Sequence, residues 1–349
     1  MPTLSEIPHS MEPVEPELDA GKRAPFWYAT LFVCMQLGAL VALLSVMARP
    51  WFLTHDGYPG IYQAGYGMRL VHADCDVVVY GDSSALTGLD PQLIAKITGL
   101  KTCNIAEARG VQDVVGFRFP LDAYLQRNKR PRFILMMLGA PSFGPGKKPF
   151  TAFSTEGMIY ALQYDHGREM LQGFRRRPTW VVNFIFWAAE TMLENQWKQL
   201  LPWTRRADID TRKQRADRDG IWPFPLPPEI NCDYSALAPG AVVERNAVDV
   251  AETRKQYAVE GTQVIINVSP ISNCNPYEGL YRKQLDGLHD NALVALPMPY
   301  FNMTDVHFSP EGSAYISTAA ANQILELMHQ DDLKKLNTPS PTLRGSIGK

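Results

Sequence analysis

The sequence predicts an α/β protein with a doubly wound, mostly parallel sheet, preceded by one N-terminal transmembrane helix and interrupted by a helical insertion. Short apolar segments rich in β-branched residues alternate with segments of helical periodicity, a pattern typical of parallel strands joined by helices. The run 132–138 (RFILMML) is apolar throughout, as expected for a central strand covered on both faces. A long stretch without charge near the N-terminus predicts the transmembrane helix.

That stretch, residues 26–47, has a length and flanks suited to a membrane. At ~1.5 Å per residue it spans about 33 Å, and a hydrocarbon core is ~30 Å thick. Aromatic residues occur at both ends, as is typical at the headgroup level: Phe26, Trp27, Tyr28, Trp51 and Phe52. The alternatives are a buried core helix and a cleaved signal peptide. A signal peptide fits poorly, because the apolar run is long and mostly polar residues precede it.

Basic residues next to the span set the expected orientation. Lys22 and Arg23 precede it and Arg49 follows it, so the positive-inside rule favours a cytoplasmic N-terminus. We therefore expect a disordered cytoplasmic tail at 1–25, a linker at 48–72, an extracytoplasmic domain at 73–330 and a polar tail at 331–349. In a Gram-negative bacterium the protein would be anchored in the inner membrane, with its domain in the periplasm.

Composition excludes several classes of protein. Hydrophobic residues make up 46% of the 349 residues and charged residues 20%, which is sufficient for a packed core and unlike a disordered chain. Lys+Arg 34 against Asp+Glu 36 gives a net charge of -2, so no nucleic-acid partner is expected. We expect no cofactor and no metal, because no phosphate-binding loop, HExxH, EF-hand or CxxC pattern occurs.

The cysteines fit an oxidising compartment. Cys34 lies within the span, which leaves Cys75, Cys103, Cys232 and Cys274. We favour a Cys75–Cys103 disulfide, because both residues precede loops at the ends of two neighbouring predicted strands. Cys232 and Cys274 would then pair with each other. The alternative is four buried free thiols.

The expected elements follow in chain order. Strands are predicted at 76–80, 101–106, 132–138, 262–268 and, as a short fifth strand, 292–296. Helices are predicted at 90–99, 111–126, 245–260 and 310–328; the first begins at Asp90-Pro91 and ends at Gly99. An aromatic-rich helical insertion at about 141–239 would form a cap that packs on its own domain, on the membrane surface or on a membrane partner. Functional residues in such sheets lie in loops at the carboxyl ends of strands.

The first candidate site residue follows the first predicted strand, in the motif GDSS at 81–84. Ser83 would lie at the tip of the strand, just before a helix, where a hydroxyl faces a cleft and backbone N–H groups can face an anion. Ser84 is the second candidate nucleophile. The alternative is an ordinary turn at the end of a strand.

The second motif, DVHFSPEG at 305–312, precedes the last predicted helix. A serine hydroxyl needs a base to take its proton, and a carboxylate to orient that base. His307 and Asp305 supply both groups in one loop, although an Asp-x-His pattern also occurs as a helix cap. Glu107 and Arg109, in the loop after the second strand, would contact substrate or pair with each other.

Together, GDSS and DVHFSPEG resemble the SGNH/GDSL hydrolase superfamily over residues 73–140 and 260–328. The Asp-x-His form is more similar to the membrane-anchored branch that includes periplasmic alginate O-acetylation proteins. More loosely, one N-terminal span followed by a helical insertion resembles the D-alanine transfer protein of teichoic acid. The resemblance implies that Ser83 is the nucleophile, His307 the base and Asp305 its orienting acid.

The resemblance also implies an oxyanion hole. Its donors would be the N–H groups of Ser83 and Gly110, the latter in the motif NIAEARG. The family's third motif, Gly-x-Asn, is replaced by Gly-Ala-Pro at 139–141. Either another group supplies the missing donor, for which Asn104 is the candidate, or the enzyme is slow or non-hydrolytic. The family's usual Asp-x-x-His spacing would place its acid at position 304, which is Thr304 here. The assignment of Asp305 as the orienting acid therefore depends on resemblance to the Asp-x-His branch alone.

The implied function is acyl transfer through an acyl-serine intermediate. The substrate would be ester groups, O-acetyl above all, of a secreted or cell-surface polysaccharide, and we favour transfer over hydrolysis. A multi-span acyltransferase or a polysaccharide synthase complex would be the membrane partner. The alternative is a non-catalytic scaffold subunit of an exopolysaccharide synthesis and secretion complex.

Overall fold

The fold is given by a computed structural model. It describes residues 20–47, 49, 66–106, 119–143, 213–221, 247–259, 261–302 and 307–337, together with short pieces between 171 and 201. The chain divides into two compact units, Met1–Val46 and Met47–Lys349.

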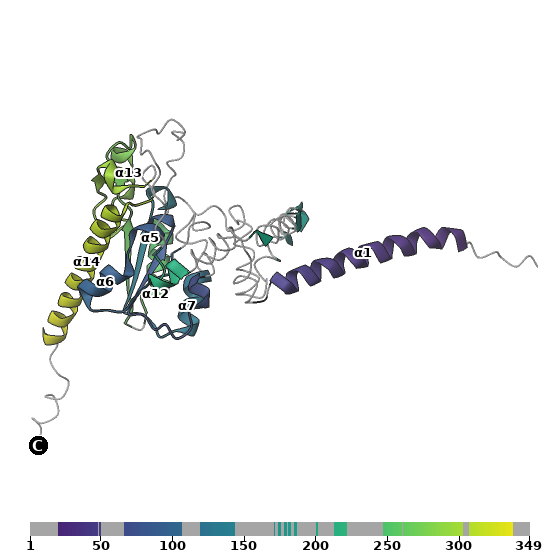
Figure 1. The fold of residues 1–349 in the computed structure, drawn as a ribbon, viewed down its shortest axis with the longest axis horizontal. Coiled ribbons are helices and arrows are strands. Elements are labelled where there is room, and N and C mark those ends of the chain that lie inside the picture. Colours follow the sequence, from purple (N-terminus) through teal and green to yellow (C-terminus); the bar gives the residue numbers. More distant parts are fainter. Residues whose placement is uncertain are drawn as a thin grey trace, which may run out of the picture. The chain divides into compact units, whose positions relative to one another are not determined.

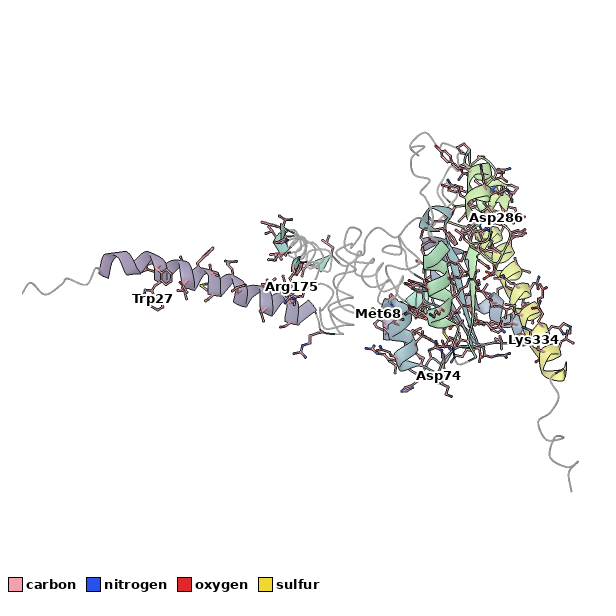
Figure 2. The ribbon with its side chains drawn as sticks, turned by 180° about the vertical axis from the view of Figure 1, so that it is seen from behind. Trp27, Met68, Asp74, Arg175, Asp286 and Lys334 are labelled. Atoms are coloured by element: carbon pink, nitrogen blue, oxygen red, sulfur yellow. A yellow bond between two sulfur atoms is a disulfide. The ribbon has the colours of Figure 1, made fainter. Side chains whose placement is uncertain are left out.

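The first unit contains helix α1 (Ala20–Met47), whose side chains, Trp27 among them, project on all sides (Figure 2). Its segment Phe26–Val46 has a mean hydropathy of 2.2, and none of that segment is buried. Thr30 and Ser45 donate their hydroxyls to carbonyl groups one turn earlier, which satisfies these polar groups within the helix. The helix is thus long and apolar enough to cross a membrane. It begins at Ala20, so the end of the expected disordered tail is helical.

The second unit is built on a parallel sheet of four strands, and its mixed α/β class is the one predicted (Figure 1). The strands are β1 (Val77–Gly81), β2 (Thr102–Asn104), β3 (Phe133–Leu138) and β4 (Gln263–Val268), in the order β2-β1-β3-β4. The chain runs from β1 outward to β2 and then crosses to β3 on the other side of β1. The carboxyl ends of β1 and β3 are therefore where the direction of winding changes, a common place for ligand sites.

Alternate strand residues face opposite sides of this sheet. On one side Val79, Leu135 and Ile265 pack in a core with Ile316 and Ile324 of the last helix, α14 (Pro310–Asn337). Helix α6 (Pro91–Thr98) lies on this side with α14, whereas α7 (Phe119–Arg127) and α12 (Ala247–Tyr257) lie on the other (Figure 1). Burial on both faces explains why the strands are continuous apolar runs.

Local signals placed several helices correctly. Asp90 caps α6 by accepting from the backbone of Gln92 and Leu93, and Gly99 ends the helix at φ 72°.

The remaining short elements are α4 (Tyr66–Arg69), α5 (Ser83–Gly88), η1 (Ala140–Phe143), α13 (Glu278–Leu285) and η3 (Met298–Tyr300).

Two elements near the C-terminal end of the domain differ from the prediction. The expected fifth strand is β6 (Ala295–Leu296), which pairs with β5 (Ile271–Ser272) in a separate two-stranded sheet and does not extend the main one. Helix α14 continues to Asn337, past the expected end at residue 328 and into the expected polar tail. The segment 329–337 contains no glycine or proline that would stop a helix.

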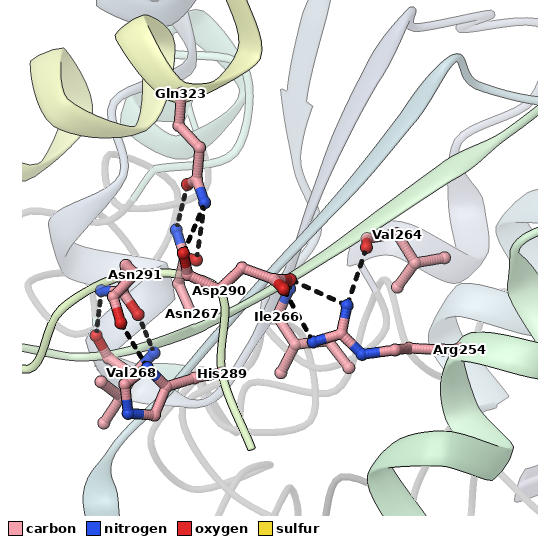
Figure 3. A network of polar contacts seen from close by, with 9 residues as sticks. All are labelled: Arg254, Val264, Ile266, Asn267, Val268, His289, Asp290, Asn291 and Gln323. Carbon is pink, nitrogen blue, oxygen red and sulfur yellow. Dashed lines mark hydrogen bonds and ion pairs between the residues drawn. The ribbon is translucent and has the colours of Figure 1, made fainter. Parts of the chain in front are cut away.

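The outer edge of β4 is covered by polar side chains (Figure 3). Asp290 accepts the N–H of Ile266 and forms a two-pronged ion pair with Arg254 of α12. Asn291 accepts from the N–H of Val268 and donates to its C=O, at 2.8 Å each. These side chains replace a fifth strand and protect the edge from pairing with another chain.

Part of the insertion packs on this domain, as one of the alternatives predicted. Residues 213–217 are helical, and Arg215 is buried. Its guanidinium donates to the carbonyls of Ala106 and Gly220 and lies 4.4 Å from the centre of the Tyr66 ring. These contacts join the insertion to the loop after β2. Most of the rest of the predicted cap lies outside the described residues.

Cys75, two residues before β1, and Cys103, in the middle of β2, form the predicted disulfide. Cys274 is also in a disulfide, and the partner predicted for it, Cys232, lies outside the described residues. Cys34 of α1 is a free thiol.

Candidate functional site

The GDSS motif forms the junction between β1 and α5. Gly81 has φ 152°, and a Cβ at this position would lie 1.9 Å from the carbonyl oxygen of Met137 in β3. Only glycine fits such a close approach of two strand ends. The Asp82 carboxylate then caps α5, because Oδ1 accepts from the backbone N–H of Ser84 at 2.9 Å.

The other contacts of Asp82 fix the loop after β3. Its Oδ2 accepts the backbone N–H of Gly139 at 2.8 Å. The carboxylate therefore ties together the carboxyl ends of β1 and β3, where the direction of winding changes.

The two adjacent serines have different environments. Ser84 is buried, and its hydroxyl donates to Asp82 Oδ1 at 2.6 Å, so it completes the helix cap. Ser83 is partly exposed, and within the described part of the chain its hydroxyl makes no hydrogen bond. A nucleophile has to reach substrate, so the structure favours Ser83 over Ser84.

The second motif reaches this junction through a narrow hairpin. Phe301 and Phe308 pair as an antiparallel bridge, and the N–H of Asn302 donates to the carbonyl of His307 at 2.8 Å. The N–H of Ser309 donates to Tyr300 at 3.0 Å on the other side of the bridge. A backbone hydrogen bond therefore holds His307 directly beside this bridge.

The hairpin packs directly on α5. A Cβ at Gly88 would lie 2.6 Å from the Phe308 ring, so the absent side chain makes room for that ring. The hydroxyl of Thr87 accepts from the N–H of Phe308 at 3.4 Å and donates to the carbonyl of Ser83 at 2.9 Å. One threonine thus connects the backbones of the two motifs, which lie more than two hundred positions apart in the sequence.

Electrostatics place Asp82 near His307. Burial lowers the pKa of His307 from its usual value of 6.5, and the negative charge of Asp82 opposes that shift. The imidazole is consequently neutral at pH 7 and able to accept a proton. His307 and Ser83 do not share a hydrogen bond in this structure, and catalytic hydrogen bonds often tighten only when substrate binds.

Several predicted site residues lie outside the described residues. These are the proposed orienting acid, the glycine of the oxyanion hole and the two charged residues after β2: Asp305, Gly110, Glu107 and Arg109. Their roles stay predictions.

Asn104 does not have the role that we predicted for it. It is fully buried, and its side-chain NH₂ donates to the carbonyls of Ala85 and Leu89 at 2.9 Å each. Its Oδ1 accepts the N–H of Ala106. Both N–H donors are used to hold the end of α5, so neither is available to an oxyanion.

Sequence reasoning missed two groups at this junction. Asp82 lies within the GDSS motif, and an Asp before two serines is a recognisable helix cap that the sequence prediction did not use. Thr87 gave no signal, because its role depends on a distant segment. Among the described residues no group of three His, Cys, Asp or Glu side chains could hold a metal ion.

Comparison with models of known protein families and with curated proteins gives no match to this chain.

Proposed function

We propose that this protein is a membrane-anchored serine acyltransferase or esterase of the SGNH type, acting on O-acetyl groups of a secreted or cell-surface polysaccharide. The observation that supports this proposal most is that the segment carrying the half-buried His307 packs on α5, the helix that begins with the partly exposed Ser83. The parallel strand order and the resemblance of the two motifs support the same proposal.

The reaction would proceed in two halves. The imidazole of His307 takes the hydroxyl proton of Ser83 while Oγ bonds to the carbonyl carbon of the donor ester. The donor C–O bond then breaks, the leaving alcohol takes the proton, and an acyl-serine ester remains. In the second half a sugar hydroxyl, or water, gives its proton to His307 and attacks the acyl carbon. The bond between the acyl carbon and Oγ then breaks, and His307 returns the proton to Ser83.

The N-terminal helix would hold this chemistry at a membrane. With the basic residues Lys22 and Arg23 on the cytoplasmic side, the domain would lie outside the cytoplasm, in the periplasm of a Gram-negative cell. A multi-span acyltransferase in the same membrane would be the source of acyl groups.

The test uses the full chain in lipid nanodiscs with p-nitrophenyl acetate as donor. We expect release of nitrophenolate and a mass increase of one acetyl group on the peptide that carries Ser83. Ser83→Ala and His307→Gln should reduce the rate to that of uncatalysed hydrolysis. Ser84→Ala is the matched control: it should lose stability and keep the acetyl-enzyme. Full activity in Ser83→Ala would overturn the proposal.

One observation favours the alternative, a non-catalytic scaffold subunit in exopolysaccharide secretion. Two donors that could have served an oxyanion are both engaged elsewhere: the Asn104 amide holds α5, and the Gly139 N–H donates to Asp82. Losing one such donor costs ~10²–10³ in rate. A cell that carries Ser83→Ala and still acetylates its polysaccharide normally would support the scaffold.

A further inference from the structure

A separate pocket of about 370 Å³ lies between α14 and the segment that follows α13. Its lining includes the buried side chains of Met137 of β3 and Asn267 of β4, and, at its exposed mouth, Tyr315 and Ala319 of α14. Ser83 and His307 are not among its lining residues. The volume is within the usual range for small-molecule sites.

The pocket lies where β4 has a polar residue at a position that faces the apolar core. Asn267 occupies the face of β4 on which Ile265 joins the apolar core, next to Met137 of β3. Opposite it, α14 presents the small side chains of Ala319 and Ala320. In a well-packed core, larger apolar side chains would fill this space. The asparagine and the two alanines leave it open and polar.

Amide groups form one wall (Figure 3). Asn267 donates to Gln323 at 2.8 Å, whereas Gln323 donates back to Asn267 and to the Asp290 carbonyl at 3.4 Å each. Bonds of 3.4 Å are at the weak end of the range, so a ligand oxygen can replace them at little cost. Asn291 and Asn322 add two further amides to the lining.

This set of groups matches hydroxyl chemistry. Each amide offers a donor and an acceptor side by side, which is the complement of a sugar hydroxyl. Tyr315 is 43% exposed at the mouth and offers a ring face for the C–H side of a sugar.

The charged residues that line the pocket favour neutral saccharides over anionic ones. The charged residues among those that line it are Asp290 and Glu326, both acidic. Asp290 is already paired with Arg254, whose guanidinium lies on its carboxylate. An anionic sugar would meet like charge here without a cationic partner, which disfavours it.

We infer that this pocket binds a neutral saccharide, with Asn267, Gln323 and Tyr315 as its principal contacts. The inference goes beyond the proposed acyl chemistry, because it concerns a site without the nucleophile. It would hold one unit of a glycan beside the domain's reactive junction and would favour neutral chains over polyuronates.

The test is saturation-transfer NMR on the full chain in nanodiscs, which avoids detergents with sugar headgroups. Cellobiose and chitobiose are the neutral probes, and digalacturonate is the anionic one. We expect binding of a neutral disaccharide that weakens at least about tenfold in Ala319→Trp, which fills the mouth from an exposed position. The matched control Ala314→Trp is exposed on the same helix outside the pocket and should bind normally.

Three results would overturn the inference: no neutral disaccharide binds, digalacturonate binds equally well, or Ala319→Trp binds as the unmodified chain does. Ser83→Ala separates this inference from the proposed function. It should bind saccharide normally while lacking esterase activity, so each idea can fail without the other.

Discussion

The two motifs that meet at the junction are held in different ways. GDSS itself contains the residues that fix it: Asp82 caps the helix that follows, and Gly81, which has no side chain, allows the end of β1 to approach Met137 of β3. The segment that carries His307 depends also on a distant helix, because an added Cβ at Gly88 of α5 would lie 2.6 Å from Phe308. A nearer contact involves Gly312, where an added Cβ would lie 2.0 Å from the Tyr300 carbonyl oxygen. A local motif can be recognised from its letters, whereas a docked segment depends on contacts that the letters do not show.

This difference predicts that adding one methyl group, by a Gly→Ala substitution, changes the free energy of unfolding by different amounts in the two motifs. Glycines with open space around them serve as controls for each.

The largest effect is expected at the local motif, in Gly81→Ala. The new Cβ would lie 1.9 Å from a backbone oxygen at a φ of 152°, so neither the strand ends nor the backbone can accommodate it. We expect a loss of more than about 4 kcal/mol in unfolding free energy, measured by chemical denaturation of the full chain. The control Gly99→Ala also has positive φ but nothing within 4 Å, and should lose about 1 kcal/mol. Equal losses in the two variants would contradict this account.

The docked segment is tested by Gly312→Ala. The clash with the Tyr300 carbonyl would loosen the hairpin neck and cost about 1–3 kcal/mol. The esterase rate should fall by more than the loss of folded protein accounts for, because the same hairpin carries His307. The control Gly279→Ala, at an open helical position, should stabilise the protein by up to ~1 kcal/mol. If Gly312→Ala kept both melting temperature and esterase rate, the segment would not depend on this contact.

The same contrast explains what the sequence could and could not predict. The bounds of α6 followed from Asp90 and Gly99, because caps are local chemistry. The role of Asn104 was predicted wrongly, because nothing in NIAEARG shows that the carbonyls of Ala85 and Leu89 need its amide. The strand at 295–296 was assigned to the main sheet, because a short apolar run does not reveal its partner. The sequence ranks Ser83 ahead of Ser84 by resemblance alone, and the burial of Ser84 gives a physical reason for that order.

A third, smaller effect is expected at the edge of the sheet. Asp290→Ala removes the acceptor for the Ile266 N–H and the partner of Arg254, which leaves both groups to water. We expect a loss of about 1–2 kcal/mol in unfolding free energy. Glu278→Ala removes an exposed ion pair with Arg282 within one helix and should cost only about 0.3–0.5 kcal/mol. Equal losses would mean that Asp290 acts only as a surface charge.

The smallest effect is a shift in pH dependence that connects the two motifs. Because burial lowers the pKa of His307 below 6.5, the imidazole stays neutral on lowering the pH until that lower value is reached. Esterase activity should therefore fall on the acidic side with an apparent pKa below 6.5. Between the two values the unfolded chain binds more protons than the folded one, so stability also decreases as the pH falls through this window.

Asp82→Asn sharpens this prediction, because it removes the charge that raises the pKa of His307 while burial continues to lower it. The acidic limb of the esterase profile should move to still lower pH, even though the variant also loses the acceptor for the Gly139 N–H and some stability. Asp90→Asn, which changes a cap on the neighbouring helix, is the control and should leave the limb in place. A limb that moved upward in Asp82→Asn, or moved equally in both variants, would show that the first motif does not act on the imidazole of the second.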